Sequence, residues 1–154
     1  MGFVARILLA SDFSPDSTVA VEIAKEAAQR FQAEVIVLHV DQGAGAAPLS
    51  PEATARRELA RRRLAEICAE LARDQVSAAP LLRTGDPARE ILRVAEDRCV
   101  GLIVIGTHGE PVSRSLLLGS VADRVLRYAS APVLSVRHHS RVTPPPWDVA
   151  DRAN

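Results

Sequence analysis

The chain alternates short apolar runs with longer segments of helical periodicity, and this alternation restricts the fold more than any other feature. Several runs, such as VIVL and LIVI, are apolar at every position, which is typical of strands covered on both faces of a parallel sheet. Right-handed crossovers between such strands predict an α/β fold: a doubly wound, five-stranded parallel sheet with helices on both faces. The predicted strands are Arg6–Ala10, Glu34–Val40, Ala78–Arg83, Leu102–Gly106 and Pro132–Arg137.

Four helices are expected between and after these strands, each with one apolar stripe to bury. The first three begin with a capping residue followed by proline, at Ser14-Pro15, Ser50-Pro51 and Asp86-Pro87. The fourth begins near Gly119-Ser120 without proline, which leaves its first-turn N–H groups available to an anion. The four predicted stripes are Val19, Ala20, Ile23, Ala24, Ala27, Ala28 and Phe31; Leu64, Ile67, Cys68 and Leu71; Ala88, Ile91, Leu92 and Ala95; and Val121, Ala122, Val125, Leu126 and Ala129.

The composition is that of one soluble globular domain. A chain of 154 residues is long enough to bury a core without disulfides or metals. Its 19 basic and 19 acidic residues cancel, so no overall field attracts nucleic acid or an anionic membrane. No stretch reaches the roughly 18 apolar residues of a membrane helix, and the first residues lack the features of an export signal. We therefore expect a cytoplasmic protein with neither a nucleic-acid nor a membrane partner.

Three further features have ordinary explanations. Cys68 and Cys99 lack the spacing of metal ligands, which indicates buried or idle thiols in a reducing compartment. The arginine run from 56 to 63 is interleaved with glutamates, such as Glu58 four residues before Arg62, which indicates a solvated helix face. His138-His139 would point to opposite faces of a strand, which disfavours a metal site there.

Three of the eight glycines lie in one segment, GTHGEPVSRSLLLGSVADRV, which runs from residue 106 to residue 125. Gly106 ends the predicted fourth strand, and Gly119 opens the fourth helix. Backbone N–H groups of Gly109, Gly119, Ser120 and Val121 could donate to phosphate oxygens, assisted by the helix dipole. The alternative is that the glycines serve only a strand exit and a helix start, since the pattern is neither G-x-G-x-x-G nor a P-loop.

From Phe3 to about Arg137 the chain resembles the universal stress protein family. The resemblance is carried by Gly106-x-x-Gly109, nine residues, then Gly119-Ser120, which matches that family's ATP-binding motif. The stretches ASDFSPDS, VLHV, LIVIGTHG and APVLSVR are further marks of the family. The resemblance implies a Rossmann-like fold of the adenine nucleotide alpha hydrolase type over residues 1–138. The proline-containing tail, 139–154, is expected to be extended or disordered.

The resemblance also implies an ATP site, with AMP or ADP as alternative ligands and Mg²⁺ or Mn²⁺ coordinated by the triphosphate. In this site Asp12 lies by the ribose and adenine, Ala10 and Ser11 line the same edge, and Val40 holds the adenine through its backbone. For Asp12, helix capping shared with Ser14 is the alternative. The residues implied at the ribose and inner phosphates are Gly106, His108 and Gly109, and those at the outer phosphates are Gly119, Ser120, Val121 and Ala122.

The functional hypothesis is an ATP-binding stress-response regulator, a nucleotide-dependent dimeric switch with at most slow hydrolysis. The resemblance implies a homodimer through the last strand, Pro132–Arg137, and the signalling partner is unknown. No catalytic residue and no protein metal ligand are assigned. One alternative is an interaction module of the same fold that binds no nucleotide, because Glu110 places a negative charge near the proposed phosphates. A phosphoryl- or adenylyl-transfer enzyme is the other alternative, and it would need a second substrate pocket.

Overall fold

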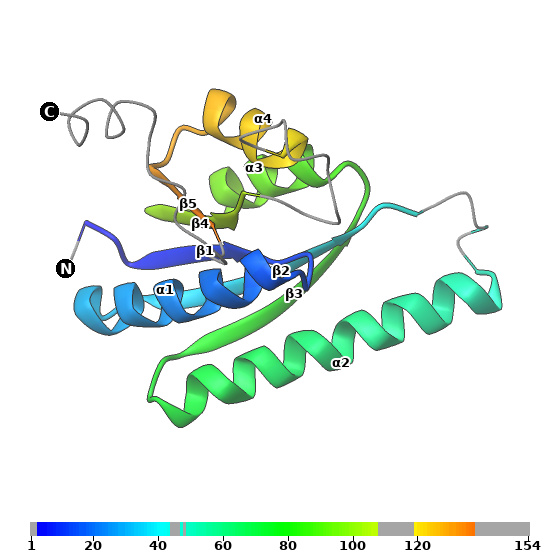
Figure 1. Ribbon diagram of the computed structural model, residues 1–154, viewed down its shortest axis with the longest axis horizontal. Coiled ribbons are helices and arrows are strands. Elements are labelled where there is room, and N and C mark those ends of the chain that lie inside the picture. The colour runs from blue at the N-terminus through cyan, green and yellow to red at the C-terminus, as the bar shows by residue number, and fades with distance from the viewer. Residues whose placement is uncertain (1–2, 44–46, 48, 108–118, 138–154) are drawn as a thin grey trace, which may run out of the picture.

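The structure is a computed structural model that describes residues 3–43, 47, 49–107 and 119–137. Within these residues one parallel sheet has the strand order β3-β2-β1-β4-β5, and helices cover both of its faces (Figure 1). The predicted doubly wound fold is confirmed. The strands are β1 (Arg6–Ala10), β2 (Glu34–Asp41), β3 (Ala78–Thr84), β4 (Leu102–Gly106) and β5 (Val133–Val136), and the helices are α1 (Pro15–Phe31), α2 (Pro51–Arg73), α3 (Pro87–Asp97) and α4 (Ser120–Tyr128).

The strand boundaries differ from the predicted ones at three strands. β2 and β3 each extend one residue further, because Asp41 and Thr84 still pair with each other in the ladder. β5 is shorter at both ends than the predicted Pro132–Arg137. Proline has no N–H to donate, although the Pro132 carbonyl still accepts from the N–H of Ile103 at 2.9 Å.

The first three helices begin where the sequence predicts. The side chains of Ser14, Ser50 and Asp86 each accept a hydrogen bond from an N–H of the first turn, and proline follows each cap. These bonds satisfy donors that have no acceptor within the helix. The helix starts are therefore written locally in the sequence.

Two layers of helices bury the two faces of the sheet (Figure 1). Leu9 and Val37 pack with α1 and α2 on one face, whereas Leu8 and Leu38 pack with α3 and α4 on the other. This alternation follows from the two-residue period of a strand, and with both faces covered the strand runs must be wholly apolar. No helix in the described ranges combines the length and apolar character that a membrane span needs.

Two members of the predicted stripes are wrong. Phe31 is 49% exposed because it is the last residue of α1, where the chain leaves the sheet through the left-handed Gln32. Leu126 is 41% exposed. The short helix α4 buries Ala122 and Val125, and Leu126 is rotated by about 100° from Val125 around the helix axis.

Candidate functional site

A cavity of about 510 Å³ lies at the carboxyl ends of β1, β2 and β4 and is flanked by the first turns of α3 and α4. Strand order reverses between β1 and β4, because the chain goes from β1 outward to β2 and β3 and later returns to β4 on the other side. Loops leaving the two strands diverge there and open a crevice, which is the usual ligand position in such sheets. The cavity is lined by Ala10, Ser11, Asp12, Ser17, Leu38, His39, Val40, Asp41, Gln42, Arg56, Pro87, Ile91, Ile105, Gly106, Thr107, Gly119, Ser120, Val121 and Ala122.

The structure brings together every predicted site residue that it describes. The residues from the resemblance that line this cavity are Ala10, Ser11, Asp12, Val40, Gly106, Gly119, Ser120, Val121 and Ala122. His108 and Gly109 lie outside the described residues, as do Glu110, His138, His139 and the tail 139–154. The roles assigned to these residues remain predictions.

The first turn of α4 opens into the cavity without a side-chain cap. Its N-cap is Gly119, and the first helical hydrogen bond runs from the N–H of Asp123 to the Gly119 carbonyl at 2.9 Å. Ser120, Val121 and Ala122 therefore have N–H groups without an acceptor inside the helix, and all three residues line the cavity. The N–H of Gly119, expected as a phosphate donor, instead donates to the Thr107 carbonyl at 2.6 Å. This end of the cavity suits an anion.

Gly106 has a packing role that the sequence analysis did not foresee. A Cβ at this position would lie 3.0 Å from the Cβ of Asp16 and 3.1 Å from the Asp16 carbonyl carbon. Only glycine lets the end of β4 approach the first turn of α1 so closely. The hydroxyl of Thr107 donates to the buried Asp16 carboxylate at 3.1 Å and fastens the same contact. Thr107 was missed because threonine after a strand carries no distinctive signal.

Asp12 has the helix-supporting role that was the alternative to a nucleotide contact. Its Oδ1 accepts from the N–H of Ser14 at 2.9 Å and from the hydroxyl of Ser17, so it supports the start of α1. Within the described residues its Oδ2 has no such contact, and Asp12 also lines the cavity. The side chain therefore stabilises the helix start at the edge of the cavity, and its contact with a ribose or adenine remains a prediction.

The turn between β1 and α1 is held in an unusual backbone conformation. Phe13 has φ +64°, the left-handed region that bulky residues rarely adopt, and its N–H donates to the Ser11 hydroxyl at 3.2 Å. Its ring stacks on His39 with centroids 4.4 Å apart. The guanidinium of Arg63 lies 5.3 Å from the same ring. Arg63 thus contacts an aromatic ring while it remains exposed, as the predicted solvated face requires.

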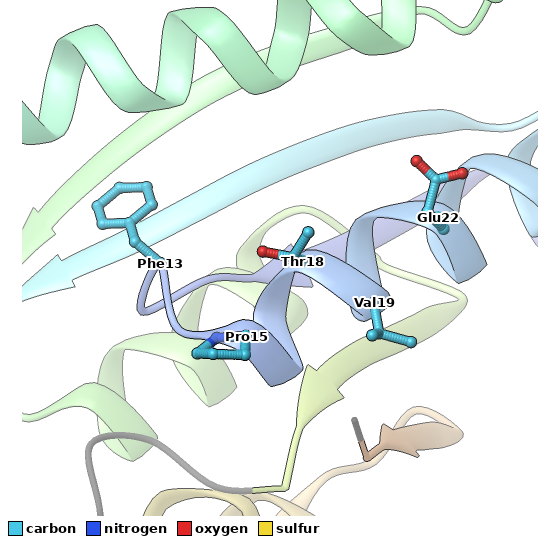
Figure 2. A pocket seen from close by; sticks show the side chains of 5 residues that line it. All are labelled: Phe13, Pro15, Thr18, Val19 and Glu22. Atoms are coloured by element: carbon cyan, nitrogen blue, oxygen red, sulfur yellow. The ribbon is translucent and has the colours of Figure 1, made fainter. Parts of the chain in front are cut away.

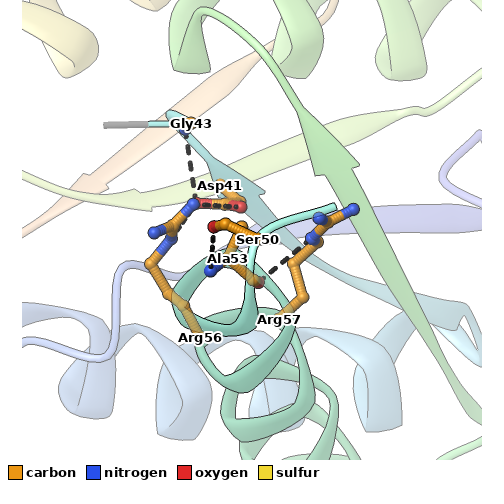
Figure 3. Close-up of polar contacts among 6 residues, drawn as sticks. All are labelled: Asp41, Gly43, Ser50, Ala53, Arg56 and Arg57. Atoms are coloured by element: carbon orange, nitrogen blue, oxygen red, sulfur yellow. Dashed lines mark hydrogen bonds and ion pairs between the residues drawn. The ribbon is translucent and has the colours of Figure 1, made fainter. Parts of the chain in front are cut away.

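Arg56 departs from the solvated face that the arginine run predicted, because its side chain is only half-exposed and binds a buried carboxylate. Its Nε donates to Asp41 Oδ1 at 2.6 Å, and one terminal nitrogen donates to Oδ2 at 3.1 Å (Figure 3). The Asp41 side chain is 6% exposed, and its Oδ1 also accepts from the N–H of Gly43. The hydrogen bonds from Arg56 hold the pKa of the Asp41 carboxyl below its usual value, and Asp41 in turn raises the pKa of Arg56.

This pair joins two elements at the rim of the cavity. Asp41 ends β2, Arg56 lies in the second turn of α2, and both line the cavity. Another expected contact of the run is also replaced: Glu58 lies 3.9 Å from Arg61, in place of the predicted pair with Arg62. The sequence feature that could have indicated this pair is Asp41, directly after the buried run VLHV. A carboxylate at such a position needs a cation nearby.

A second hollow, of about 460 Å³, lies along the start of α1 and is lined by Phe13, Pro15, Thr18, Val19 and Glu22 (Figure 2). All five residues come from α1 and the turn before it, and Glu22 is the charged one among them. No strand end or uncapped helix start contributes to it. The cavity at the strand ends, where polar groups from separate elements converge, is the candidate site.

The carboxylates at the candidate site already accept hydrogen bonds from protein groups. No group of three His, Cys, Asp or Glu residues suited to a metal occurs among the described residues. The carboxylate of Asp41 already accepts from Arg56, and Oδ1 of Asp12 from the start of α1.

Comparison with known proteins gives consistent matches over the folded part of the chain. The model of the universal stress protein family matches residues 4–137. Universal stress protein YxiE of Bacillus subtilis is 33% identical over 145 residues, covering 86% of this chain and 98% of that protein. A universal stress protein of Thermus aquaticus is 38% identical over 135 residues, covering 85% of this chain and 97% of that one.

Solved structures share the fold. The structure of MJ0577, a universal stress protein of Methanocaldococcus jannaschii, matches with a TM-score of 0.80 at 29% identity, over 90% of this chain and 99% of that one. A universal stress protein of Archaeoglobus fulgidus, solved in complex with dAMP, matches with a TM-score of 0.67 at 21% identity, over 88% of this chain and 99% of that one. Another universal stress protein, solved in complex with cAMP, matches with a TM-score of 0.68 at 22% identity, over 87% of this chain and 97% of that one.

Proposed function

The chain belongs to the universal stress protein family, and from this membership and the geometry of the cavity we propose that it is a regulatory protein that binds ATP at the ends of β1, β2 and β4. The observation that carries the proposal is the uncapped start of α4, which opens into the same cavity as the predicted base and ribose residues. Two proteins of this fold were solved with the adenine nucleotides dAMP and cAMP. At their low identity they support the fold, and the ligand assignment for this chain depends on its own residues.

The phosphates are assigned to the start of α4. The N–H groups of Ser120, Val121 and Ala122 have no helical acceptor, and the Ser120 hydroxyl adds a donor. The positive end of the helix dipole and hydrogen bonds to phosphate oxygens both favour negative charge at this place. Mg²⁺ or Mn²⁺ bound to the triphosphate would neutralise the negative charge that remains after the phosphates bind the start of α4.

The adenine is assigned to the end of β2. The Leu38 carbonyl accepts from the N–H of Ser11, so the peptide groups of Val40, two residues later, point to the same side of the strand. β1 has already ended at Ala10, and no backbone group in the described residues bonds to those of Val40. A free N–H and C=O side by side match the neighbouring acceptor and amino donor of adenine.

Regulation accounts for the site better than fast catalysis does. The Asp41 carboxylate accepts hydrogen bonds from Arg56, and Asp12 accepts one from the N–H of Ser14 at the start of α1. Neither carboxylate is therefore positioned as a general base for water. His108, the remaining candidate near the phosphates, lies outside the described residues. ATP would then act mainly by being bound, with at most slow hydrolysis.

We also propose a homodimer through β5, as the resemblance implies. β5 is an edge strand of the sheet, and its Leu134 side chain is 41% exposed. Pairing with a second copy would cover an apolar edge that otherwise invites aggregation. Nucleotide occupancy could reach this edge through Thr107, which lines the cavity and donates its N–H to the Val136 carbonyl at 2.8 Å.

The test is to identify the nucleotide released from the purified protein by chromatography and mass spectrometry, and then to titrate adenosine, AMP, ADP and ATP with Mg²⁺ by calorimetry. The proposal expects an adenine nucleotide and an affinity that rises with the number of phosphates. Absence of binding up to millimolar ATP would reject the site. An interaction module of the same fold that binds no nucleotide would then be the better account.

A further inference from the structure

We propose that the pair formed by Asp41 and Arg56 selects the nucleobase: Arg56 occupies both oxygens of the Asp41 carboxylate and so removes the acceptor that would otherwise bind guanine. The inference rests on the proposed nucleotide site, because it specifies which base the β2 end of that site accepts. Arg56 acts through Asp41 and is a positioning residue. Neither residue belongs to the set that the resemblance assigns to the nucleotide.

Both oxygens of the Asp41 carboxylate accept hydrogen bonds from Arg56. Arg56 donates to Oδ1 at 2.6 Å through Nε and to Oδ2 at 3.1 Å through a terminal nitrogen. The N–H of Gly43 donates to Oδ1 as well, at 3.3 Å. The Asp41 side chain is 6% exposed, so water cannot replace these partners easily. A planar guanidinium fits both oxygens at once, which an ammonium cannot do.

The position of the pair makes this closure relevant to the base. Asp41 directly follows Val40, whose peptide groups point to the β1 side of the strand, and Val40, Asp41 and Arg56 all line the cavity. The start of α4, which attracts an anion, and the end of β2 line the same cavity from different elements. A nucleotide with its phosphates at α4 would direct its base toward the end of β2. Asp41 therefore lies where the pairing edge of the base is read.

The chemistry of the two purines explains why a closed carboxylate favours adenine. The pairing edge of guanine offers two adjacent donors, its ring N–H and its amino group, and a free carboxylate accepts both. Adenine offers one amino donor beside a ring acceptor, which a free carboxylate would repel. An open Asp41 would therefore favour guanine, whereas an Asp41 covered by Arg56 offers guanine no free carboxylate and leaves adenine to the Val40 backbone.

A purely structural role makes a different prediction. If the pair only ties α2 to the end of β2, breaking it weakens every nucleotide to the same extent. If the pair selects the base, breaking it changes the ratio of the GTP and ATP dissociation constants. That ratio is the readout, because a general loss of order in the site does not move it.

The experiment titrates ATP and GTP, each with Mg²⁺, into the unaltered protein and into Arg56→Gln. We expect the ratio of affinities to shift toward GTP by roughly tenfold or more in the variant, the size expected of one hydrogen bond to a charged group. Arg61→Gln is the matched control. It makes the same change on the same helix, but Arg61 is 61% exposed, does not line the cavity, and should leave the ratio unaltered.

Two further variants keep the test decisive if Arg56→Gln does not fold. Arg56→Lys preserves the charge but cannot cover both oxygens, so the ratio should shift in the same direction by less. The double variant Asp41→Asn with Arg56→Gln has no carboxylate to expose, and it should return the ratio to that of the unaltered protein. An unchanged ratio in Arg56→Lys and Arg56→Gln, with ATP still bound, would overturn this inference alone. Failure of the unaltered protein to bind either nucleotide would overturn the proposed function and this inference together.

Discussion

The two ends of the cavity differ in how their polar groups are satisfied. At the start of α4, Ser120, Val121 and Ala122 present N–H groups without helical acceptors, behind a glycine N-cap. At the end of β2, the Asp41 carboxylate accepts two hydrogen bonds from Arg56 and one from Gly43. An open donor set attracts an anion, whereas a covered carboxylate attracts neither a cation nor a base donor. Affinity for the phosphates and selectivity for the base can therefore be assigned to different elements of one cavity.

The largest expected effect comes from closing the open end. Gly119→Val adds a branched side chain at the N-cap, which lines the cavity, while the φ of −65° there is one that valine can adopt. Loss of two hydrogen bonds to phosphate, about 1.5–3 kcal/mol each, corresponds to an ATP affinity roughly 100-fold weaker or more. Calorimetric titration measures the loss. The control is a helical circular dichroism spectrum like that of the unaltered protein. An ATP affinity equal to that of the unaltered protein would mean that the phosphates do not bind at the start of α4.

Opening the covered end should reduce stability. Arg56→Gln leaves the buried Asp41 carboxylate without its cation, so we expect the melting temperature to fall by roughly 3–8 °C. Arg61→Gln should leave the melting temperature within about 1 °C, since exposed ion pairs contribute little. Equal melting temperatures for the two variants would mean that the Asp41 carboxylate is not stabilised by Arg56.

The same variant makes a pH prediction that sharpens the comparison. Arg56 lowers the pKa of Asp41 in the folded protein, so the ionised Asp41 stabilises the unaltered protein above the unfolded-state pKa of about 4. This contribution is lost as the pH falls through the lower folded-state pKa of Asp41. Arg56→Gln removes the largest cause of the lowering, so the pKa of Asp41 should be higher in the variant than in the unaltered protein. The difference in unfolding free energy between the two proteins should therefore shrink as the pH falls from the folded-state pKa of Asp41 in the variant to the lower one in the unaltered protein. A difference that stays constant from pH 7 to pH 3 in denaturant titrations would contradict this.

The smallest effects should separate helix caps from ligand groups. Ser50 caps α2 by accepting from the N–H of Ala53 at 3.1 Å, so Ser50→Ala should cost about 1 kcal/mol of unfolding free energy and leave ATP affinity unchanged. Ser120 follows the glycine cap of α4, so Ser120→Ala should do the reverse, weakening ATP by roughly threefold to tenfold with little change in stability. Denaturant titration and calorimetry on both variants check the pair. A stability loss in Ser120→Ala equal to that in Ser50→Ala would remove the distinction.

The sequence predicted the sheet and the helix starts because both depend on local or repeated signals. Wholly apolar runs predict buried parallel strands, and a cap followed by proline predicts a helix start. Gly119 was predicted from the glycine spacing, whereas Asp12 and Val40 came from the resemblance, and all three line the cavity.

What the sequence could not predict depends on contacts between distant segments. Arg56 reaches Asp41 because of the way the chain between β2 and α2 returns, and no local pattern encodes that path. The left-handed Phe13, stacked on His39, and the contact of Thr107 with Asp16 likewise need the assembled sheet. The exposure of Phe31 shows that helical periodicity does not say where a helix leaves the core.

The most direct test of the account is a comparison of three ligands by backbone amide NMR on the isotope-labelled protein. The account predicts that adenosine shifts the amides of Val40, Asp41 and Gly43, that inorganic triphosphate shifts those of Ser120, Val121 and Ala122, and that ATP with Mg²⁺ shifts both groups. Val19, which lines the second hollow, should not respond. Adenosine shifts at α4, or ATP shifts confined to the second hollow, would contradict the assignment of base and phosphates to the two ends.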